Sequence, residues 1–203
     1  MKIFLVGATG RTGKWLLKSA LESGHTVTAL IREPIERVAH HPRLKIVAGD
    51  LFEIESLSEQ LHGQDAIVSA LNSKTVAHGV ERLVRAAEAA KVNRFIGIAG
   101  GGILQLDEKL LRRDRPDYPS MFLESSAQHL YAWRILQQSS LIWTLFCTPD
   151  LKNSEATGNA DLRVDYMPQG KNSVACGDVA SYLMRELEQG EFINKRVGCA
   201  EKI

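Results

Sequence analysis

The sequence has few cysteines, almost no net charge and no long apolar run, and each shortage excludes a class of protein. Its three cysteines, Cys147, Cys176 and Cys199, are an odd number without a C-x-x-C pair, which argues against a disulfide framework and a zinc site. The formal net charge of +1 leaves no basic surface for nucleic acid or an anionic membrane. No segment approaches the roughly 18–20 apolar residues of a membrane span. We therefore expect no metal, no nucleic-acid partner and no membrane partner.

The chain length and the cysteines bear on the number of domains and on the cellular location. A chain of 203 residues is long enough for one domain with its own core, so we expect a single domain over 1–203. No signal peptide precedes the first strand-like residues, and the cysteines suit small buried apolar residues better than nucleophiles. The expected location is therefore the cytoplasm.

What the sequence does have is a glycine-rich stretch close to its start. Residues 2–6 are nearly all apolar, Gly7, Gly10 and Gly13 follow at intervals of three, and a helical pattern begins directly afterwards. A strand that enters a helix through a tight turn aims free N–H groups and the positive end of the helix dipole at a phosphate. Gly7 permits the turn, Gly10 lets the backbone approach a pyrophosphate, and Gly13 lets the helix pack closely. Thr9 and Thr12 add hydroxyl donors. The alternative, a purely structural turn, does not explain three glycines, each of which costs conformational entropy.

The rest of the chain alternates between strand and helix patterns. We predict helices at 11–23, 54–61, 76–91, 121–139 and 178–187, and strands at 2–6, 26–31, 44–48, 65–71, 94–99, 141–147, 162–166, 173–176 and 196–199. Such alternation gives a parallel sheet with right-handed crossovers. The predicted fold is α/β: a Rossmann-like, doubly wound, mainly parallel sheet with helices on both faces.

The end of the second strand bears on the choice of cofactor. Arg32 suits a 2′-phosphate, whereas NAD-selective sites place an acidic residue near this point. Arg11, in the glycine turn, could approach the same phosphate from the other side. Glu33 could instead take a ribose hydroxyl, and Arg32 could be a solvated strand-end charge. We expect NADP(H) in preference to NAD(H).

Other strand ends supply further candidates. Asp50 follows the third strand and could accept the adenine amino group or cap a turn. Ala70, Leu71 and Asn72 end the fourth strand, where small residues would let a cofactor lie across. Gly100, the first of three glycines after the fifth strand, suits either a flat ring stacked on the backbone or a hinge.

A charge-dense segment, 103–120, interrupts the alternation and reads as a lid or a solvated excursion. The substrate region is expected at about 100–122 and 148–176. Tyr118 and Phe122 could form part of an aromatic platform for an acceptor.

With these residues in hand, the chain resembles the atypical short-chain dehydrogenase/reductases, within their NAD(P)H-binding, NmrA-like group. It is most similar there to the NADH-flavin reductases and to the biliverdin reductase B type of flavin reductase. The residues that carry the resemblance are 7–13, Arg32, 49–51, Ala70, Leu71, 143–149 and 177–180. The resemblance implies an oxidoreductase that passes hydride from NADP(H) to a flat, small-molecule acceptor such as a flavin or quinone. The cofactor residues it implies are Gly7, Thr9, Gly10, Arg11, Thr12, Gly13, Arg32, Asp50, Leu51, Ala70, Leu71, Gly100 and Pro149. Asn72 and Ala99, at the ends of the fourth and fifth strands, complete the expected cofactor site.

The chain departs from typical short-chain dehydrogenases in their catalytic set. Gly100 stands where those enzymes have a serine, and Arg134 stands at the lysine position of the Tyr-x-x-x-Lys pair, with Leu130 four residues before it. Carbonyl reduction needs such a proton donor, whereas flavin reduction can take its proton from solvent. His129, Tyr131 and Arg134 are the candidate assisting residues.

Two alternatives stay open. The missing serine and tyrosine also fit a non-catalytic NADP(H)-binding redox sensor of NmrA-like type. An epimerase or dehydratase is disfavoured by the missing Tyr-x-x-x-Lys and by the short C-terminal part. The sequence leaves the acceptor and the oligomeric state open.

Overall fold

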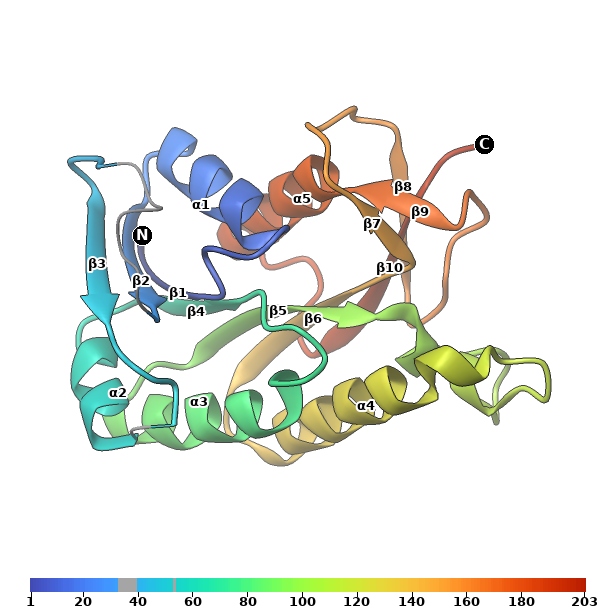
Figure 1. The fold of residues 1–203 in the computed structure, drawn as a ribbon, viewed down its shortest axis with the longest axis horizontal. Helices are drawn as coiled ribbons and strands as arrows, with labels where there is room; N and C mark the ends of the chain where they lie inside the picture. The colour runs from blue at the N-terminus through green and yellow to red at the C-terminus, as the bar shows by residue number, and fades with distance from the viewer. Residues whose placement is uncertain (33–39, 53) are drawn as a thin grey trace.

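The computed structural model describes residues 1–32, 40–52 and 54–203. Its main sheet has eight strands in the order β3, β2, β1, β4, β5, β6, β10, β8 (Figure 1). The strands are β1 Lys2–Val6, β2 Thr26–Ile31, β3 Leu44–Ala48, β4 Ala66–Ser69, β5 Arg94–Gly100, β6 Ile142–Thr148, β7 Asp150–Lys152, β8 Ala160–Val164, β9 Ser173–Ala175 and β10 Lys195–Glu201. The α-helices are α1 Gly13–Glu22, α2 Ile54–Leu61, α3 Val76–Ala90, α4 Leu123–Gln138 and α5 Cys176–Gln189.

The sheet is parallel except at one edge. Strands β1 to β6 and β10 run parallel to their neighbours, and β8 pairs antiparallel with β10 as an edge strand. From β1 the chain moves outwards through β2 to β3, then returns to place β4 on the other side of β1. This confirms the predicted Rossmann-like, mainly parallel α/β fold.

Helices cover both faces of the sheet. Figure 1 shows α1 and α5 on one face and α2, α3 and α4 on the other. Within β1, Ile3 and Leu5 join the core beneath α1 and α5, whereas Phe4 and Val6 join the core beneath α2, α3 and α4. Successive side chains of a strand point to opposite faces, so a strand covered twice must be apolar at every position. The unbroken apolar run at residues 3–6 therefore follows from the two helix layers.

Two segments differ from the sequence-based expectation. The three residues of β7 fall where no strand is predicted, and they pair in parallel with β9 in a separate two-stranded sheet. The charge-dense segment 103–120 is anchored at its start, where the Gln105 N–H donates to the Asp165 carbonyl just after the edge strand β8 (2.8 Å). Within the segment, the Arg112 N–H donates to the Leu104 carbonyl (2.8 Å). It continues through short 3₁₀ turns at Arg112–Asp114 and Ser120–Phe122 before α4 begins. This segment is therefore a loop tied to the sheet at its start, with residues 106–110 exposed and residues 111–113, 115 and 118 half-buried.

The structure also describes the state of the cysteines and the length of the helices. Cys147, Cys176 and Cys199 lie buried as free thiols. Burial raises the pKa of Cys147 and that of Cys199 to about 12, so both stay protonated and unreactive at neutral pH. Within 1–32, 40–52 and 54–203, no helix has both the length and the apolar content needed to cross a bilayer.

Candidate active site

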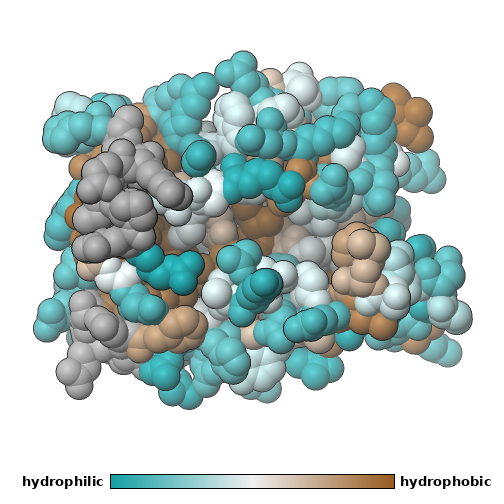
Figure 2. All heavy atoms as spheres, in the orientation of Figure 1, coloured by the Kyte–Doolittle hydropathy of each residue, from teal (hydrophilic) through white to brown (hydrophobic). Residues whose placement is uncertain are grey.

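A cleft of about 1070 Å³ lies over the carboxyl ends of the parallel strands. It is lined by the segments that follow β1 to β6 and by the start of α4. Figure 2 shows this hollow near the centre of the visible face, with hydrophobic and neutral residues inside it and hydrophilic residues around it. The chain reverses its direction across the sheet between β1 and β4, which is where open parallel sheets bind ligands.

The glycine loop forms one wall of the cleft. Gly7 has a φ of +81°, and a Cβ there would lie 2.5 Å from the Ala70 carbonyl oxygen. A Cβ on Gly13 would overlap the Gly7 carbonyl, so this glycine lets α1 start against the loop, in the packing role predicted for it. Gly10 is less constrained, because its Cβ would meet only the Gly7 oxygen, at 3.2 Å. Gly7 and Gly13 are thus required by packing, whereas Gly10 leaves the cleft side of the loop open. This is a cradle that fits a pyrophosphate.

The segments after β2 and β3 form the far end of the cleft on that side. Arg32, Asp50 and Leu51 all line it, and Arg32 is exposed. One carboxylate oxygen of Asp50 accepts the Phe52 N–H at 2.8 Å, so the turn-capping reading of Asp50 describes its contact in the structure. The predicted role of Glu33 lies outside the described residues.

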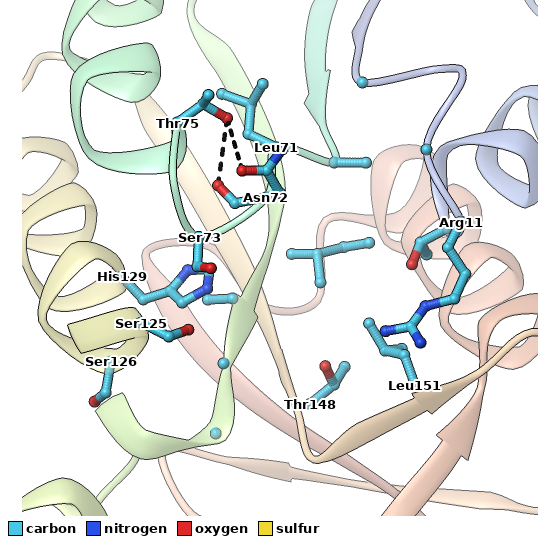
Figure 3. Close-up of a pocket in the computed structure, with 18 of the residues that line it drawn as sticks. Arg11, Leu71, Asn72, Ser73, Thr75, Ser125, Ser126, His129, Thr148 and Leu151 are labelled. Carbon is cyan, nitrogen blue, oxygen red and sulfur yellow. Dashed lines mark hydrogen bonds between the residues drawn. The ribbon is translucent and has the colours of Figure 1, made fainter. Parts of the chain in front are cut away.

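Arg11 takes a direction that the sequence did not predict. In Figure 3 its side chain extends from the glycine loop toward Leu151 of β7. Arg32 follows β2, on the other side of β1. Both arginines line the cleft, and their approach to one phosphate stays a prediction.

The end of β4 forms the middle of the cleft floor. Ala70, Leu71 and Asn72 line it, as the sequence suggested. The Asn72 side-chain oxygen accepts the Lys74 N–H at 2.9 Å and the Thr75 hydroxyl at 3.3 Å (Figure 3). Asn72 thereby shapes the turn that leads into α3.

The end of β5 carries the second glycine cluster, and polar side chains pack directly against it. A Cβ on Gly100 would lie 3.3 Å from Cδ2 of His129, and one on Gly102 would lie 2.5 Å from the Tyr118 hydroxyl and 2.6 Å from the Ser126 hydroxyl. These glycines make room for side chains of α4 and of segment 103–120. They are better explained by this close approach than by the hinge considered above.

His129 is the titratable residue at the centre of this region. It is buried at the cleft wall, and among the described residues its Nδ1 has no hydrogen-bond partner. Burial lowers the pKa of His129 to about 4, because a charged imidazolium is poorly solvated there. At neutral pH the ring is therefore uncharged, and it can offer one donor and one acceptor but no positive charge.

The structure corrects the other two catalytic candidates. Tyr131 is 44% exposed and its ring lies 6.4 Å from that of His78, while Arg134 is exposed; neither lines the cleft. At 3.6 residues per turn, Tyr131 lies about 200° and Arg134 about 140° around the helix from His129. The cleft face of α4 instead carries Ser125, Ser126 and His129 (Figure 3). The i, i+4 pair facing the cleft is thus Ser125 and His129, five residues earlier than the register chosen from the sequence.

Most of the predicted cofactor residues come together in the cleft. Those that line it are Gly7, Thr9, Gly10, Arg11, Thr12, Arg32, Asp50, Leu51, Ala70, Leu71, Asn72, Ala99, Gly100 and Pro149. The proposed platform residues Tyr118 and Phe122 line it as well. The sequence reasoning missed Ser125, Ser126, Arg112 and Arg115, which also line it. The polar residues at 125, 126 and 129 lie on one face of the helix, and this spacing could have indicated from the sequence that the two serines face the cleft. In the part of the chain that the structure describes, no three His, Cys, Asp or Glu side chains gather as metal ligands.

A parallel sheet with a glycine loop at the point where its strand order reverses defines a Rossmann-like dinucleotide-binding fold. Residues 7–190 match the protein family described as NAD(P)H-binding. The chain is 30% identical to the uncharacterized protein YwnB of Bacillus subtilis, over 97% of this chain and 96% of that protein. The chain therefore belongs to the NAD(P)H-binding family.

Solved structures give two further likenesses. A candidate NADH-flavin reductase from Streptococcus pneumoniae is 27% identical, with a TM-score of 0.86 over 100% of both chains. A candidate epimerase from Bacteroides thetaiotaomicron is 25% identical, with a TM-score of 0.90 over 100% of this chain and 97% of that one. The two proteins carry different assigned chemistries on one scaffold, so the reaction has to be argued from the site.

Proposed function

We propose that this protein is an NADPH-dependent reductase that passes a hydride to a flat acceptor such as a flavin or quinone. The observation that carries the proposal is the extent of the cleft, which continues from the glycine loop past the end of β5 to a region walled by Tyr118, Ser126 and His129. Its volume of about 1070 Å³ slightly exceeds the roughly 300–1,000 Å³ of single-ligand sites. This extent supports the binding of a dinucleotide together with a second ring system.

The arrangement of the loops favours one orientation of the cofactor. The glycine loop would hold the pyrophosphate on its N–H groups, and Arg32 would bind the 2′-phosphate of NADP(H) beyond β2. The nicotinamide would then lie on the other side of the loop, over the ends of β5 and β6 near Gly100 and Pro149. When bound there, the reduced nicotinamide supplies a hydride and leaves oxidised.

The residues of the chain have a limited part in this reaction. At neutral pH, α4 presents no strong proton donor to the cleft. His129 is uncharged there, and Ser125 and Ser126 carry only weakly acidic hydroxyl groups. The site would therefore work by holding the two rings together, and the neutral His129 would orient the acceptor by a hydrogen bond. A flavin suits this arrangement because its reduced ring is a stabilised product and its proton can come from solvent. A ketone would need a proton donor for the developing alkoxide.

The test is NADPH oxidation by the purified protein, with and without FMN, and with NADH in parallel. We expect oxidation that depends on both protein and FMN and is faster with NADPH than with NADH at low cofactor concentration. Tight NADPH binding without turnover on FMN or on simple quinones would overturn the reductase and favour the redox sensor. Equal or better turnover with NADH would retain the reductase and overturn the role of Arg32.

A further inference from the structure

Two arginines that the sequence reasoning passed over lie in the acceptor region of the cleft. Arg112 and Arg115 come from segment 103–120, and both line the cleft beside Tyr118. Neither is fully exposed, and burial and the charge of Arg115 both lower the pKa of Arg112. Two like charges have therefore been brought close together in a partly desolvated place, which costs free energy unless an anion offsets it.

The carboxylates of the same segment do not neutralise this pair. Asp107 accepts the N–H groups of Lys109 and Leu110, and Asp114 accepts the Leu111 N–H and lies 3.7 Å from Arg113. Such contacts fix the loop and leave Arg112 with no ion pair among the residues that the structure describes.

Arg115 has one carboxylate nearby. Its Nε lies 3.2 Å from Asp117, a side chain that is 79% exposed, and the two lack hydrogen-bond geometry. An ion pair to such an exposed partner is weak, because water screens it and the carboxylate can move away. Neither arginine is therefore held in a strong ion pair among the described residues.

The pair lies in a different part of the cleft from Arg32. Arg32 follows β2, whereas the loop that carries Arg112 leaves the end of β5, three strands further along the sheet, and bonds through the Gln105 N–H to Asp165 after the edge strand β8. At a strand spacing of roughly 4.8 Å, the ends of β2 and β5 are about 14 Å apart. The pair therefore belongs to the acceptor end of the cleft and not to the end where Arg32 would hold the 2′-phosphate.

Two hydroxyls lie in the same region of the cleft. The Ser126 hydroxyl is buried without a partner among the described residues, and the Tyr118 hydroxyl lies beside it near Gly102. Buried hydroxyls without partners are rare, and a ligand oxygen would satisfy them. Guanidinium forks with nearby hydroxyls match the oxygen atoms of a phosphate.

We propose that Arg112 and Arg115 form an anion subsite that binds a phosphate group carried by the acceptor, with the hydroxyls of Tyr118 and Ser126 as further donors. The inference rests on the proposed reductase function, since it specifies the acceptor of that reaction. It selects phosphorylated flavins such as FMN over riboflavin, which has the same ring and no phosphate.

The test measures binding without turnover. Protein saturated with NADP⁺ is titrated with FMN or with riboflavin, and binding is followed by quenching of flavin fluorescence. We expect FMN to bind at least about tenfold more tightly than riboflavin, and Arg112→Gln and Arg115→Gln each to weaken FMN binding by about tenfold while changing riboflavin binding less than about twofold. Arg113→Gln is the matched control, because this neighbouring arginine does not line the cleft.

Equal affinity of the wild-type protein for the two flavins would overturn the subsite, as would variants that weaken NADP⁺ binding and leave FMN unchanged. If a variant folds poorly, the wild-type protein still decides: raising the salt concentration should weaken FMN binding and spare riboflavin. Turnover of both flavins with equal affinity would reject the subsite and keep the reductase. FMN binding through the arginines without any turnover would reject the reductase and keep the subsite.

Discussion

The two ends of the cleft are built from different parts of the chain. The end over β1, β2 and β4 is made largely of backbone, with the glycine loop, the start of α1 and the small residues that follow β4. Its two arginines, Arg11 and Arg32, are exposed. The end over β5 and β6 is made of side chains, with His129 and Ser126 buried and Arg112 and Arg115 half-buried.

This difference predicts how each end tolerates change. A site made of backbone N–H groups keeps its shape through most side-chain substitutions. It is distorted only where a glycine is replaced and the new Cβ clashes with a neighbouring segment. A wall of partly desolvated polar groups depends on a few side chains, and each of them affects both stability and recognition. The variants below act on one end at a time, from the largest expected effect to the smallest.

The largest effect is expected at Gly13. Gly13→Ala places a Cβ onto the Gly7 carbonyl, so α1 must move from the loop, and we expect a loss of more than about 3 kcal/mol in the free energy of unfolding. Gly10→Ala is the matched control, because its Cβ meets only one atom, at 3.2 Å, and should cost less than about 1 kcal/mol while weakening NADPH binding. Urea unfolding and NADPH titration measure the two quantities. Equal losses of stability would show that Gly13 has no special packing role.

The next effect concerns acid stability at the other end. The unfolded chain binds a proton at His129 near its ordinary pKa of about 6.5, whereas the folded chain does so only near 4. As the pH falls from 6.5 to 4, protonation therefore favours the unfolded state, by about 3 kcal/mol at pH 4. His129→Gln should remove this contribution.

Urea unfolding of both proteins at a series of pH values isolates the histidine, because the contributions of all other groups are common to both. The difference in unfolding free energy between wild type and variant should narrow or reverse as the pH falls to 4. A difference that stays constant with pH would contradict the burial of a neutral ring.

A smaller effect is expected at the exposed end. Arg32→Ala should weaken NADPH binding by about tenfold and change NADH binding less than about twofold, since only NADPH carries the 2′-phosphate. Fluorescence titration of the reduced cofactors measures both constants. Equal weakening for the two cofactors would assign Arg32 to a general electrostatic role.

The smallest effects are expected on the solvent side of α4. Tyr131→Phe and Arg134→Gln should each change kcat/KM for flavin reduction less than about twofold, because neither side chain lines the cleft. His129→Gln is the comparison on the cleft face of the same helix, where a larger change in KM is expected. A loss of more than tenfold in kcat/KM for the Tyr131 or Arg134 variant would support the catalytic roles predicted for these residues from the sequence.

The contrast between the ends also explains which parts of the site the sequence could predict. The phosphate end depends on residues adjacent in sequence, so one stretch from residue 2 to residue 13 predicted the strand, the loop and the packing roles of Gly7 and Gly13. The role of Gly10 at a pyrophosphate stays a prediction. The wall at His129 depends on the rotation of α4, which is set by packing against α3 and by contacts such as Trp133 beneath the Arg196 guanidinium. A single sequence does not specify that rotation. Matching the Tyr-x-x-x-Lys motif selected positions 130 and 134, whereas the positions that face the cleft are 125 and 129.

The remaining differences have the same origin. Strand β7 has three residues and is defined by its pairing with β9, more than twenty residues further along the chain, so local propensity gave no signal. The direction of Arg11 toward Leu151 likewise depends on where β7 lies. Arg112 and Arg115 stand among many charges in the sequence, and only the folding of segment 103–120 separates them from their neighbours.

The most direct test of the account is whether cofactor and acceptor occupy one cleft at the same time. Protein loaded with one equivalent of NADPH is mixed rapidly with increasing FMN, and the oxidation of NADPH is followed in a single turnover. We predict that the rate saturates with FMN, as expected when the flavin binds beside the nicotinamide before hydride transfer. A rate that rises without saturation, or that does not exceed the reaction of free NADPH with FMN, would contradict a two-ligand cleft.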